Sequence, residues 1–255
     1  MALTSDEALI LAVSDYSETS QIVTLFTEHN GKLRALAKGS KRPKSPFGGP
    51  LDRLQLVQAV FTVRAHGSLG LLTELAQRET FDGLRTNLKN FYAASYAAEL
   101  VIAATPDLDP QPELFGILAD TLRRLSSTPD SAILVFRFEV RLLGLLGLRP
   151  QLDQCVACHR PRESARGGFF SPAASGLLCR QCAQRPQDAP AGRQPSSFKV
   201  AGKALDALLF LAAAGDDELG RVRLASVTAA DMRRLLEAHW QYVLDRPLRA
   251  ARWVS

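Results

Sequence analysis

Four cysteines are grouped as two C-x-x-C pairs, and the chain contains no others. Cys155 and Cys158 form the first pair, and Cys179 and Cys182 form the second. The doubled motif and its spacing are typical of a two-knuckle zinc site. Four thiolates would complete a tetrahedral shell around the ion and leave no open position for water. The sequence therefore predicts one structural Zn²⁺ ion and no metal-bound water for catalysis.

Other uses of the cysteines explain the pattern less well. Two disulfide bonds are one alternative, but an intracellular chain rarely keeps them. A thioredoxin-like redox pair is another, and it does not explain why the motif is doubled. A zinc deaminase would need an open coordination site and a general-acid glutamate motif, which the chain lacks. Residues 150–183 also offer little apolar mass, so we expect them to depend on the metal, which can supply about 10 kcal/mol of folding free energy.

A cationic stretch at residues 31–50 is the second candidate site. It reads GKLRALAKGSKRPKSPFGGP and contains no acidic residue. Its first part alternates as a strand does, which places Leu33, Ala35 and Ala37 on a core face and the cations on the other face. Beyond Gly39, prolines and glycines predict an exposed, irregular loop. We interpret the strand and loop as a track for a phosphate backbone, with contacts from Lys32, Arg34, Lys38, Lys41, Arg42 and Lys44.

Two other interpretations of this stretch stay open. A run of like charge is often only a solvated face or a flexible tail. The strand that directs the charges and the lack of interleaved acids favour nucleic acid over that interpretation. Alternatively, the chain is an interaction scaffold whose basic loop docks on acidic partner proteins. Aromatic side chains that stack on bases are common in such binders, and the candidates here are Tyr16 and Phe47, with Phe26 and Phe61 expected in the core instead.

The chain contains none of the common catalytic motifs. The Gly31-Lys32 pair is not part of a G-x-x-x-x-G-K-[ST] run, so no phosphate-cradling P-loop is present. The motifs G-x-S-x-G and H-E-x-x-H are absent as well. The sequence therefore predicts a binding protein, not an enzyme, and one without a nucleotide cofactor.

The elements that would position these residues change character near residue 80. Before it, runs rich in Val, Ile, Leu, Thr and Phe are separated by short turns, which predicts strands. Five short strands in about eighty residues suit a small closed barrel, and the OB-fold is the common barrel that binds nucleic-acid strands. The predicted strands are residues 7–13, 21–27, 32–38, 54–64 and 69–77.

From residue 81 onward the apolar period is 3.6, which predicts helices. The run AILVFRFEVRLLGLLGL is apolar nearly all round and predicts the buried central helix of a bundle. Its charged residues Arg137, Glu139 and Arg141 either reach a surface edge or pair internally, and we expect internal pairing. His239 lies on an apolar face and is expected to be a core histidine. The predicted fold is α+β and multidomain: a five-stranded OB-fold barrel at residues 1–80, a helical bundle at residues 81–149 and 184–255, and an inserted four-cysteine zinc module at residues 150–183.

Composition describes an ordinary globular protein with a local basic patch. Hydrophobic residues make up 46% of the chain, the net charge is +5 and the isoelectric point is about 9.2. The excess charge matters less than its position. Because no apolar segment reaches the roughly twenty residues needed to span a bilayer, and no leader pattern is present, we expect a cytoplasmic protein without membrane partners.

Four blocks of sequence in consistent order carry a resemblance to a known family. They are DYSETSQIVTLFTEHNGKLRALAKGSKRPKSPFGGPL, YAASYAAELV, FEVRLLGLLGLRPQLDQCVAC and FFSPAASGLLCRQC. The chain resembles the RecO family of bacterial DNA repair proteins from about residue 7 to residue 182. Within these blocks, KGSKRPKSPFGG and LGLRPQLDQCVAC are the most specific. Beyond residue 182 the expected helices rest on periodicity alone.

This resemblance implies a fold and a set of partners. RecO proteins have an N-terminal OB-fold, a helical domain and, in many members, a zinc-binding cysteine module. They bind single- and double-stranded DNA, anneal complementary strands and act with RecR to load RecA on DNA coated by single-strand-binding protein, which they also contact. The resemblance thus implies a recombination mediator of the bacterial cytoplasm that associates with the nucleoid during repair. It also implies that the six cations of the basic stretch match the DNA-binding face of the family.

Overall fold

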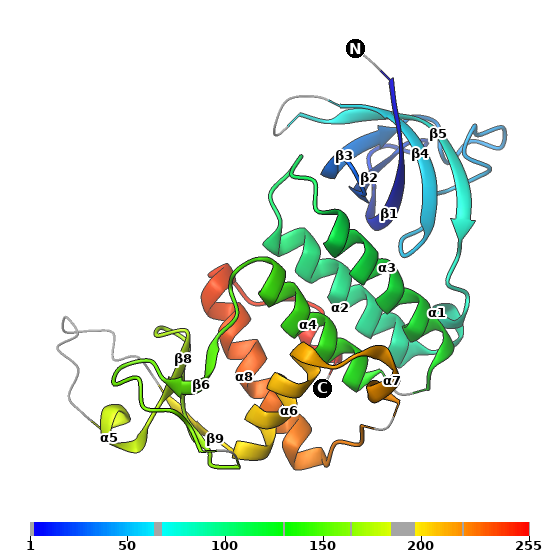
Figure 1. The fold of residues 1–255 in the computed structure, drawn as a ribbon. Helices are drawn as coiled ribbons and strands as arrows, with labels where there is room; N and C mark the ends of the chain where they lie inside the picture. The colour runs from blue at the N-terminus through cyan, green and yellow to red at the C-terminus, as the bar shows by residue number, and fades with distance from the viewer. Residues whose placement is uncertain are drawn as a thin grey trace. The chain divides into compact units, whose positions relative to one another are not determined.

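The computed structural model describes residues 3–63, 68–129, 131–163, 165–184, 197–220 and 222–254. The last residue of the predicted strand 54–64, and residues 185–196 of the predicted helical segment, lie outside the described residues. The chain divides into two compact units, Met1–Ser131 and Ala132–Trp253, which are described separately. Figure 1 gives the labels of their helices and strands.

Five strands of the first unit form a closed barrel. Their order around it is β1-β2-β3-β5-β4, and β4 pairs back with β1. The β3–β5 pair is parallel, and the other four pairs are antiparallel. All five strands that the sequence predicts are present, with ends that differ by a few residues. They are β1 (Leu3–Asp15), β2 (Gln21–Thr27), β3 (Gly31–Ala37), β4 (Leu56–Thr62) and β5 (Gly70–Glu79).

The interior of the barrel is filled by the side chains that alternate inward along each strand. On β3, Leu33 is 5% exposed, and Ala35 and Ala37 are fully buried, which confirms the predicted core face. Phe26 and Phe61 are also fully buried, as the sequence predicts. The inner face of β3 is therefore fixed by packing, and its outer face consists of Lys32, Arg34 and the half-buried Leu36.

Three helices complete the described part of the first unit. They are α1 (Gly83–Thr86), α2 (Leu88–Ala104) and α3 (Pro112–Ser127). Asn87 caps α2 by accepting a hydrogen bond from the backbone N–H of Asn90. The buried Asn90 side chain donates in turn to the carbonyl of Leu125, 2.8 Å away, and so ties α2 to the end of α3.

The start of β3 is joined to the far end of α2 through a buried lysine. Lys32 is only 8% exposed, and its Nζ donates to the carbonyls of Ile102 (2.7 Å) and Thr105 (2.5 Å). The last carbonyls of a helix have no partner within the helix and carry partial negative charge, so an ammonium group there is stabilising. Asp107 lies 3.4 Å from the same Nζ. Lys32 thus connects the barrel to its helices.

The second unit combines a small sheet with helices. The strands β6 (Gln151–Cys155), β7 (Gly168–Ser171), β8 (Gly176–Leu178) and β9 (Phe198–Val200) lie in the order β6-β8-β7-β9. A single helical turn, α5 (Arg180–Ala183), follows β8. Of the remaining helices, α4, α6 and α8 pack against one another. Within the described residues, these remaining helices are α4 (Ala132–Leu145), α6 (Gly202–Ala213), α7 (Asp216–Leu219), α8 (Ser226–Leu244) and the 3-10 helix η1 (Ala251–Trp253).

The central part of α4 is buried on all sides, as the sequence predicts, and its residues Arg137 and Glu139 are paired. Glu139 is fully buried and accepts hydrogen bonds from Arg233 Nη1 (2.7 Å) and Trp240 Nε1 (3.1 Å). Arg137 forms an ion pair with Asp216. A buried carboxylate without such partners would cost several kcal/mol, so these bonds are what allow acid and base inside the helix.

The predicted boundaries at residues 80, 149 and 183 stay a prediction. In the structure, α1, α2 and α3 group with the barrel, and α4, α6, α7 and α8 group with the cysteine-bearing sheet. Among the described residues, no helix is both long enough and apolar enough to cross a bilayer.

Replacing Lys32 by Met should destabilise the first unit without altering the apolar part of the side chain. We expect the free energy of unfolding to fall by about 2–3 kcal/mol, since hydrogen bonds to a charged group contribute about 1.5–3 kcal/mol. Chemical denaturation of the full chain measures this loss. Lys38→Met is the matched control, because Lys38 is exposed at the other end of the strand, and it should change stability by less than about 0.5 kcal/mol. Equal losses in the two variants would contradict the structural role of Lys32.

Candidate functional site

Residues 38–50 are turns and bends that form most of the connection from β3 to β4, and they are called the cationic loop below. It contains no helix or strand, as the sequence predicts. Its side chains Lys38, Arg42 and Lys44 are exposed, and Lys41 is half-buried. Together with the exposed Arg34 on β3, these residues form what we call the cationic surface: Arg34, Lys38, Lys41, Arg42 and Lys44.

Polar contacts hold both ends of the cationic loop against β2. Gln21 Oε1 accepts a hydrogen bond from Ser40 Oγ (2.9 Å) and another from the backbone N–H of Leu51 (2.8 Å). The backbone N–H of Gly39 donates to Ser20 Oγ at 3.0 Å. Ser40 and Gln21 are both buried, so these bonds are shielded from competing water. The loop is therefore irregular in shape but fixed at its base.

The middle of the loop is anchored by an aromatic side chain. Phe47 is half-buried and packs against the barrel core. Gly48 follows it with φ +75°, a left-handed conformation that glycine adopts without strain. Phe47 was one of the predicted stacking candidates, and its contact with the core gives it a structural role. Of the four candidates, Tyr16 alone is strongly exposed, at 61%.

Lys32 does not belong to the cationic surface, which corrects the sequence-based expectation. The strand alternation is as predicted, and Lys32 does point to the same face of β3 as Arg34. However, the end of α2 covers that face at the beginning of the strand, and the Lys32 ammonium group is bound to helix carbonyls there. A phosphate could reach it only by breaking those bonds. We therefore leave Lys32 out of any nucleic-acid contact.

One carboxylate from elsewhere in the chain reaches the cationic surface. Asp15 Oδ2, at the end of β1, lies 2.8 Å from Lys41 Nζ. Within the described part of the chain, no ion pair engages the other four cations of the surface. The Asp15 contact joins residues that are distant in sequence, and nothing in the local pattern indicates it. Four cations without an ion pair, Arg34 on β3 and three in the cationic loop, are suited to bind a chain of phosphates.

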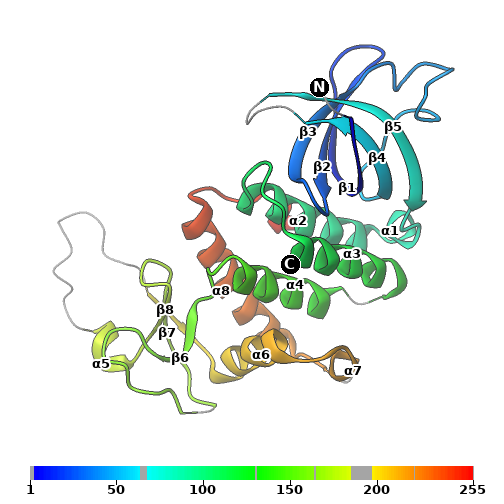
Figure 2. The same cartoon turned by 45° about the horizontal axis from the view of Figure 1, so that its top comes forward.

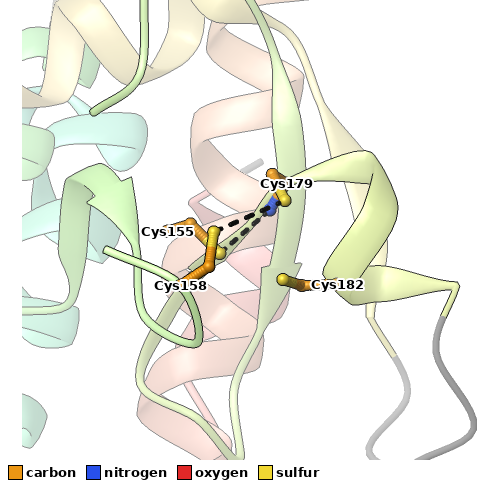
Figure 3. Close-up of side chains that lie close together, drawn as sticks. All are labelled: Cys155, Cys158, Cys179 and Cys182. Atoms are coloured by element: carbon orange, nitrogen blue, oxygen red, sulfur yellow. Dashed lines mark hydrogen bonds between the residues drawn. The ribbon is translucent and has the colours of Figure 1, made fainter. Parts of the chain in front are cut away.

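The four cysteines form a second candidate site, in the other unit. Figure 3 shows their side chains converging from the end of β6, the end of β8 and the turn of α5. The four sulfur atoms all lie within 4.8 Å of one another. Cys158 Sγ and Cys179 Sγ are 3.9 Å apart. Ligands 2.3 Å from a tetrahedral zinc ion would be about 3.8 Å apart, so this spacing fits a zinc thiolate site. None of the four cysteines forms a disulfide, so that alternative is wrong for this structure.

Hydrogen bonds and burial shift the pKa values of the thiols in different directions. Burial raises the pKa of Cys155, but hydrogen bonds from backbone N–H groups, that of Cys179 first, outweigh it and lower the pKa to about 6. The hydrogen bond with Cys179, followed by burial, raises the pKa of Cys182 to about 12. Four thiolates cannot share so small a volume without a cation to offset their repulsion. The donor set therefore fits a soft divalent ion such as Zn²⁺, held by four sulfurs.

A third group of possible metal ligands, Asp6, Glu28 and His29, has a structural explanation. Asp6 is 5% exposed and accepts hydrogen bonds from His29 N (2.9 Å), His29 Nδ1 (3.0 Å) and Asn30 Nδ2 (2.7 Å). These bonds close the turn between β2 and β3 and use both carboxylate oxygens. We therefore regard the group as a turn support and not as a metal site.

Two sequence families match nearly the whole chain. Residues 1–81 match the family described as Recombination protein O N terminal. Residues 85–252 match the family described as Recombination protein O C terminal. The boundary between the matches falls between β5 and α2, where the chain passes from strands to helices.

The chain is also similar to bacterial proteins that carry the name DNA repair protein RecO. It is 35% identical over 206 residues to one from Rhodopirellula baltica, covering 80% of this chain and 73% of that protein. It is 32% identical over 250 residues to one from Symbiobacterium thermophilum, covering 96% and 93%. The identity is 27% over 254 residues with one from Bacillus subtilis, covering 99% and 94%.

We predict that the stabilisation provided by the hydrogen bond between Asp6 and His29 depends on pH. The hydrogen bond to Asp6 raises the pKa of His29 above its ordinary value of 6.5. Because the pKa is raised in the folded state, the stabilisation is complete below about pH 6.5 and is lost as pH rises through the folded-state pKa. NMR titration of the His29 ring should therefore give a pKa above 6.5, and Asp6→Asn should lower it. A His29 pKa that does not respond to Asp6→Asn would contradict this assignment.

Proposed function

The chain belongs to the recombination protein O family, and from that membership we propose that it is a DNA-binding recombination mediator in DNA repair. The structural observation that carries the proposal is the cationic surface at the end of β3, whose residues are exposed apart from the half-buried Lys41. Phosphate oxygens are the ligands that such an array of Lys and Arg side chains attracts most strongly. In the proposed mechanism the chain acts by binding and not by catalysis.

We further propose that the barrel is an OB-fold and that it holds a DNA strand by its phosphates. The strand order β1-β2-β3-β5-β4, closed by the pairing of β4 with β1, supports this assignment. The cationic loop is held at both ends by Gln21, so its charges need little further ordering when a strand binds. Contacts made only to phosphates give weak sequence preference, which suits a repair protein that must accept any sequence.

Annealing of complementary strands follows from the same electrostatics. Two single strands repel each other through their phosphates, and cations bound to both lower that repulsion. Family membership supports three further parts of the proposal: action with RecR, help in loading RecA, and contact with single-strand-binding protein on coated DNA. It also supports a location in the bacterial cytoplasm, with the nucleoid during repair. Neither annealing nor these contacts requires a nucleotide cofactor.

For the cysteine cluster we propose one structural zinc ion bound by Cys155, Cys158, Cys179 and Cys182. When bound, the ion would offset the negative charge of the four thiolates and cross-link β6 to the segment around α5. Besides three of the cysteines, the small apolar cluster at this site contains Leu178, with Val156, Phe169 and Ala183 packed against it. So few apolar contacts support a dependence of this segment on the metal.

Charge reversal of the cationic loop tests the DNA-binding proposal. We expect the variant with Lys38, Lys41, Arg42 and Lys44 all replaced by Glu to lose most of its affinity for single- and double-stranded DNA. For the unaltered chain, contact with about five phosphates of a single strand predicts a slope of log affinity against log salt of about −3.5. Fluorescence anisotropy with labelled oligonucleotides at several salt concentrations measures both quantities.

A control variant separates a local effect from one of net charge. Replacing Arg78, Lys89, Lys199 and Lys203 by Glu changes the net charge equally, and these four residues are exposed elsewhere on the chain. We expect it to bind DNA nearly as the unaltered chain does. If both variants lost affinity equally, the cationic surface would not be the binding site. If the purified unaltered chain failed to bind DNA, the alternative of a scaffold for acidic partner proteins would replace this proposal.

The zinc proposal is tested by metal analysis of the purified chain. We expect one zinc ion per chain, and less than a tenth of that in the Cys155→Ser, Cys179→Ser double variant. Loss of the metal should increase proteolysis within residues 150–183 and leave the barrel folded, because the cysteines belong to the other unit. Retention of zinc by the double variant, or full resistance to proteolysis without it, would contradict the proposed structural role.

A further inference from the structure

An exposed aromatic ring lies in the turn between β1 and β2. Tyr16 is 61% exposed, although an apolar surface as large as its ring is usually buried. Its backbone is not loose: the N–H of Tyr16 donates to the carbonyl of Ser20 (2.9 Å), and the N–H of Ser17 donates to the same carbonyl (3.1 Å). The turn therefore presents the ring to solvent from a closed, hydrogen-bonded backbone.

This turn is joined directly to the cationic loop. The backbone N–H of Lys41 donates to the carbonyl of Thr19 at 3.1 Å, and Lys41 Nζ reaches Asp15 at 2.8 Å. A third contact runs from the N–H of Gly39 to Ser20 Oγ. Figure 2 shows the β1–β2 turn and the long β3–β4 connection at the same end of the barrel. An aromatic ring and an array of cations thus border one another on a single fixed surface.

The two parts of this surface suit different parts of a nucleic acid. Lys and Arg side chains bind phosphates, whereas a tyrosine ring offers a flat apolar face on which a base can stack. Asp15 at the end of β1 and Glu18 in the turn are both acidic and exposed. Negative charge there disfavours a phosphate over the turn and leaves a neutral base as the favourable contact. In a duplex the bases are already stacked on one another, so only an unpaired base can use the ring.

We propose that Tyr16 is a base-stacking residue and that its ligand is an unpaired nucleobase of a single strand held by the cationic surface. The inference rests on the proposed function and extends it. Phosphate contacts alone hold single strands and duplexes alike, while the ring adds affinity only for the single strand. Tyr16 is then the residue that makes the surface prefer single-stranded DNA.

The test compares Tyr16→Ala with Tyr16→Trp in the full chain. One stacked base contributes about 1–3 kcal/mol, so Tyr16→Ala should weaken binding of a single-stranded oligonucleotide by about tenfold. Binding of the blunt duplex of the same sequence should not change. The salt slope should not change either, because no ion pair is removed. Tyr16→Trp keeps an aromatic ring at this position and should retain the single-strand affinity of the unaltered chain. Fluorescence anisotropy at several salt concentrations measures the affinities of the variants for single strand and duplex and the salt slope.

Two controls make the outcome specific to a base. Tyr242→Ala removes another exposed tyrosine, 53% exposed on α8, and should leave single-strand affinity unchanged. An abasic strand keeps the phosphates but offers no base, so the unaltered chain and Tyr16→Ala should bind it equally. Circular dichroism and thermal unfolding establish that the variants are folded, as expected for side chains that are more than half exposed.

Three results would overturn the inference. The first is unchanged single-strand affinity in Tyr16→Ala, which would leave the ring available for a protein partner instead. The second is an equal loss on single strands and duplexes, and the third is a loss that persists on the abasic strand. The proposed function is tested separately, and it is wrong if charge reversal of the cationic loop leaves DNA binding intact. If charge reversal abolishes DNA binding but Tyr16→Ala leaves single-strand affinity unchanged, only the role of Tyr16 is wrong.

Discussion

In the first unit, the attachment of the barrel to its helices depends on one buried ammonium group, that of Lys32. Lys32 Nζ satisfies two carbonyls at the end of α2, and its position on β3 means that barrel and helix cannot shift relative to each other without losing both bonds. The preceding Gly31 reinforces this junction, since a Cβ there would lie 2.4 Å from the carbonyl oxygen of Asp109. Because the beginning of β3 is committed to this contact, the cations available to a ligand begin at Arg34.

A buried amide determines how those cations are presented. Gln21 binds both ends of the cationic loop, at Ser40 and Leu51, and Phe47 fixes its middle on the barrel core. The loop thus uses its polar and apolar residues to hold its shape. Of its cations only Lys41 is paired, with Asp15, and Lys38, Arg42 and Lys44 form no ion pair within the described part of the chain. Fixing the loop before binding reduces the ordering cost that a flexible basic tail would incur. Both proposals, for phosphates and for an unpaired base, rely on this rigidity.

Each unit also contains polar groups that would be unfavourable alone. In the second unit, the four thiols cannot all ionise without a cation, and Glu139 is buried at the centre of α4. Glu139 is stabilised by Arg233 and Trp240, which lie 94 and 101 residues further along the chain. These partners belong to α8, so the helix that packs on α4 also neutralises it. The sequence predicted that Glu139 is paired, but it could not identify the partner.

The sequence by itself determined the features that depend on short-range pattern. Alternation of apolar residues predicted the strands and the inward face of β3, and the 3.6-residue period predicted the helices. The C-x-x-C spacing predicted that the four cysteines lie close together. Only the tertiary structure decided what covers each outward side chain. Lys32 and Arg34 share a face and a residue class, yet the end of α2 buries one and not the other. Asp15 reaches Lys41 for the same reason: contacts between distant segments depend on packing, which leaves no periodic signal along the chain.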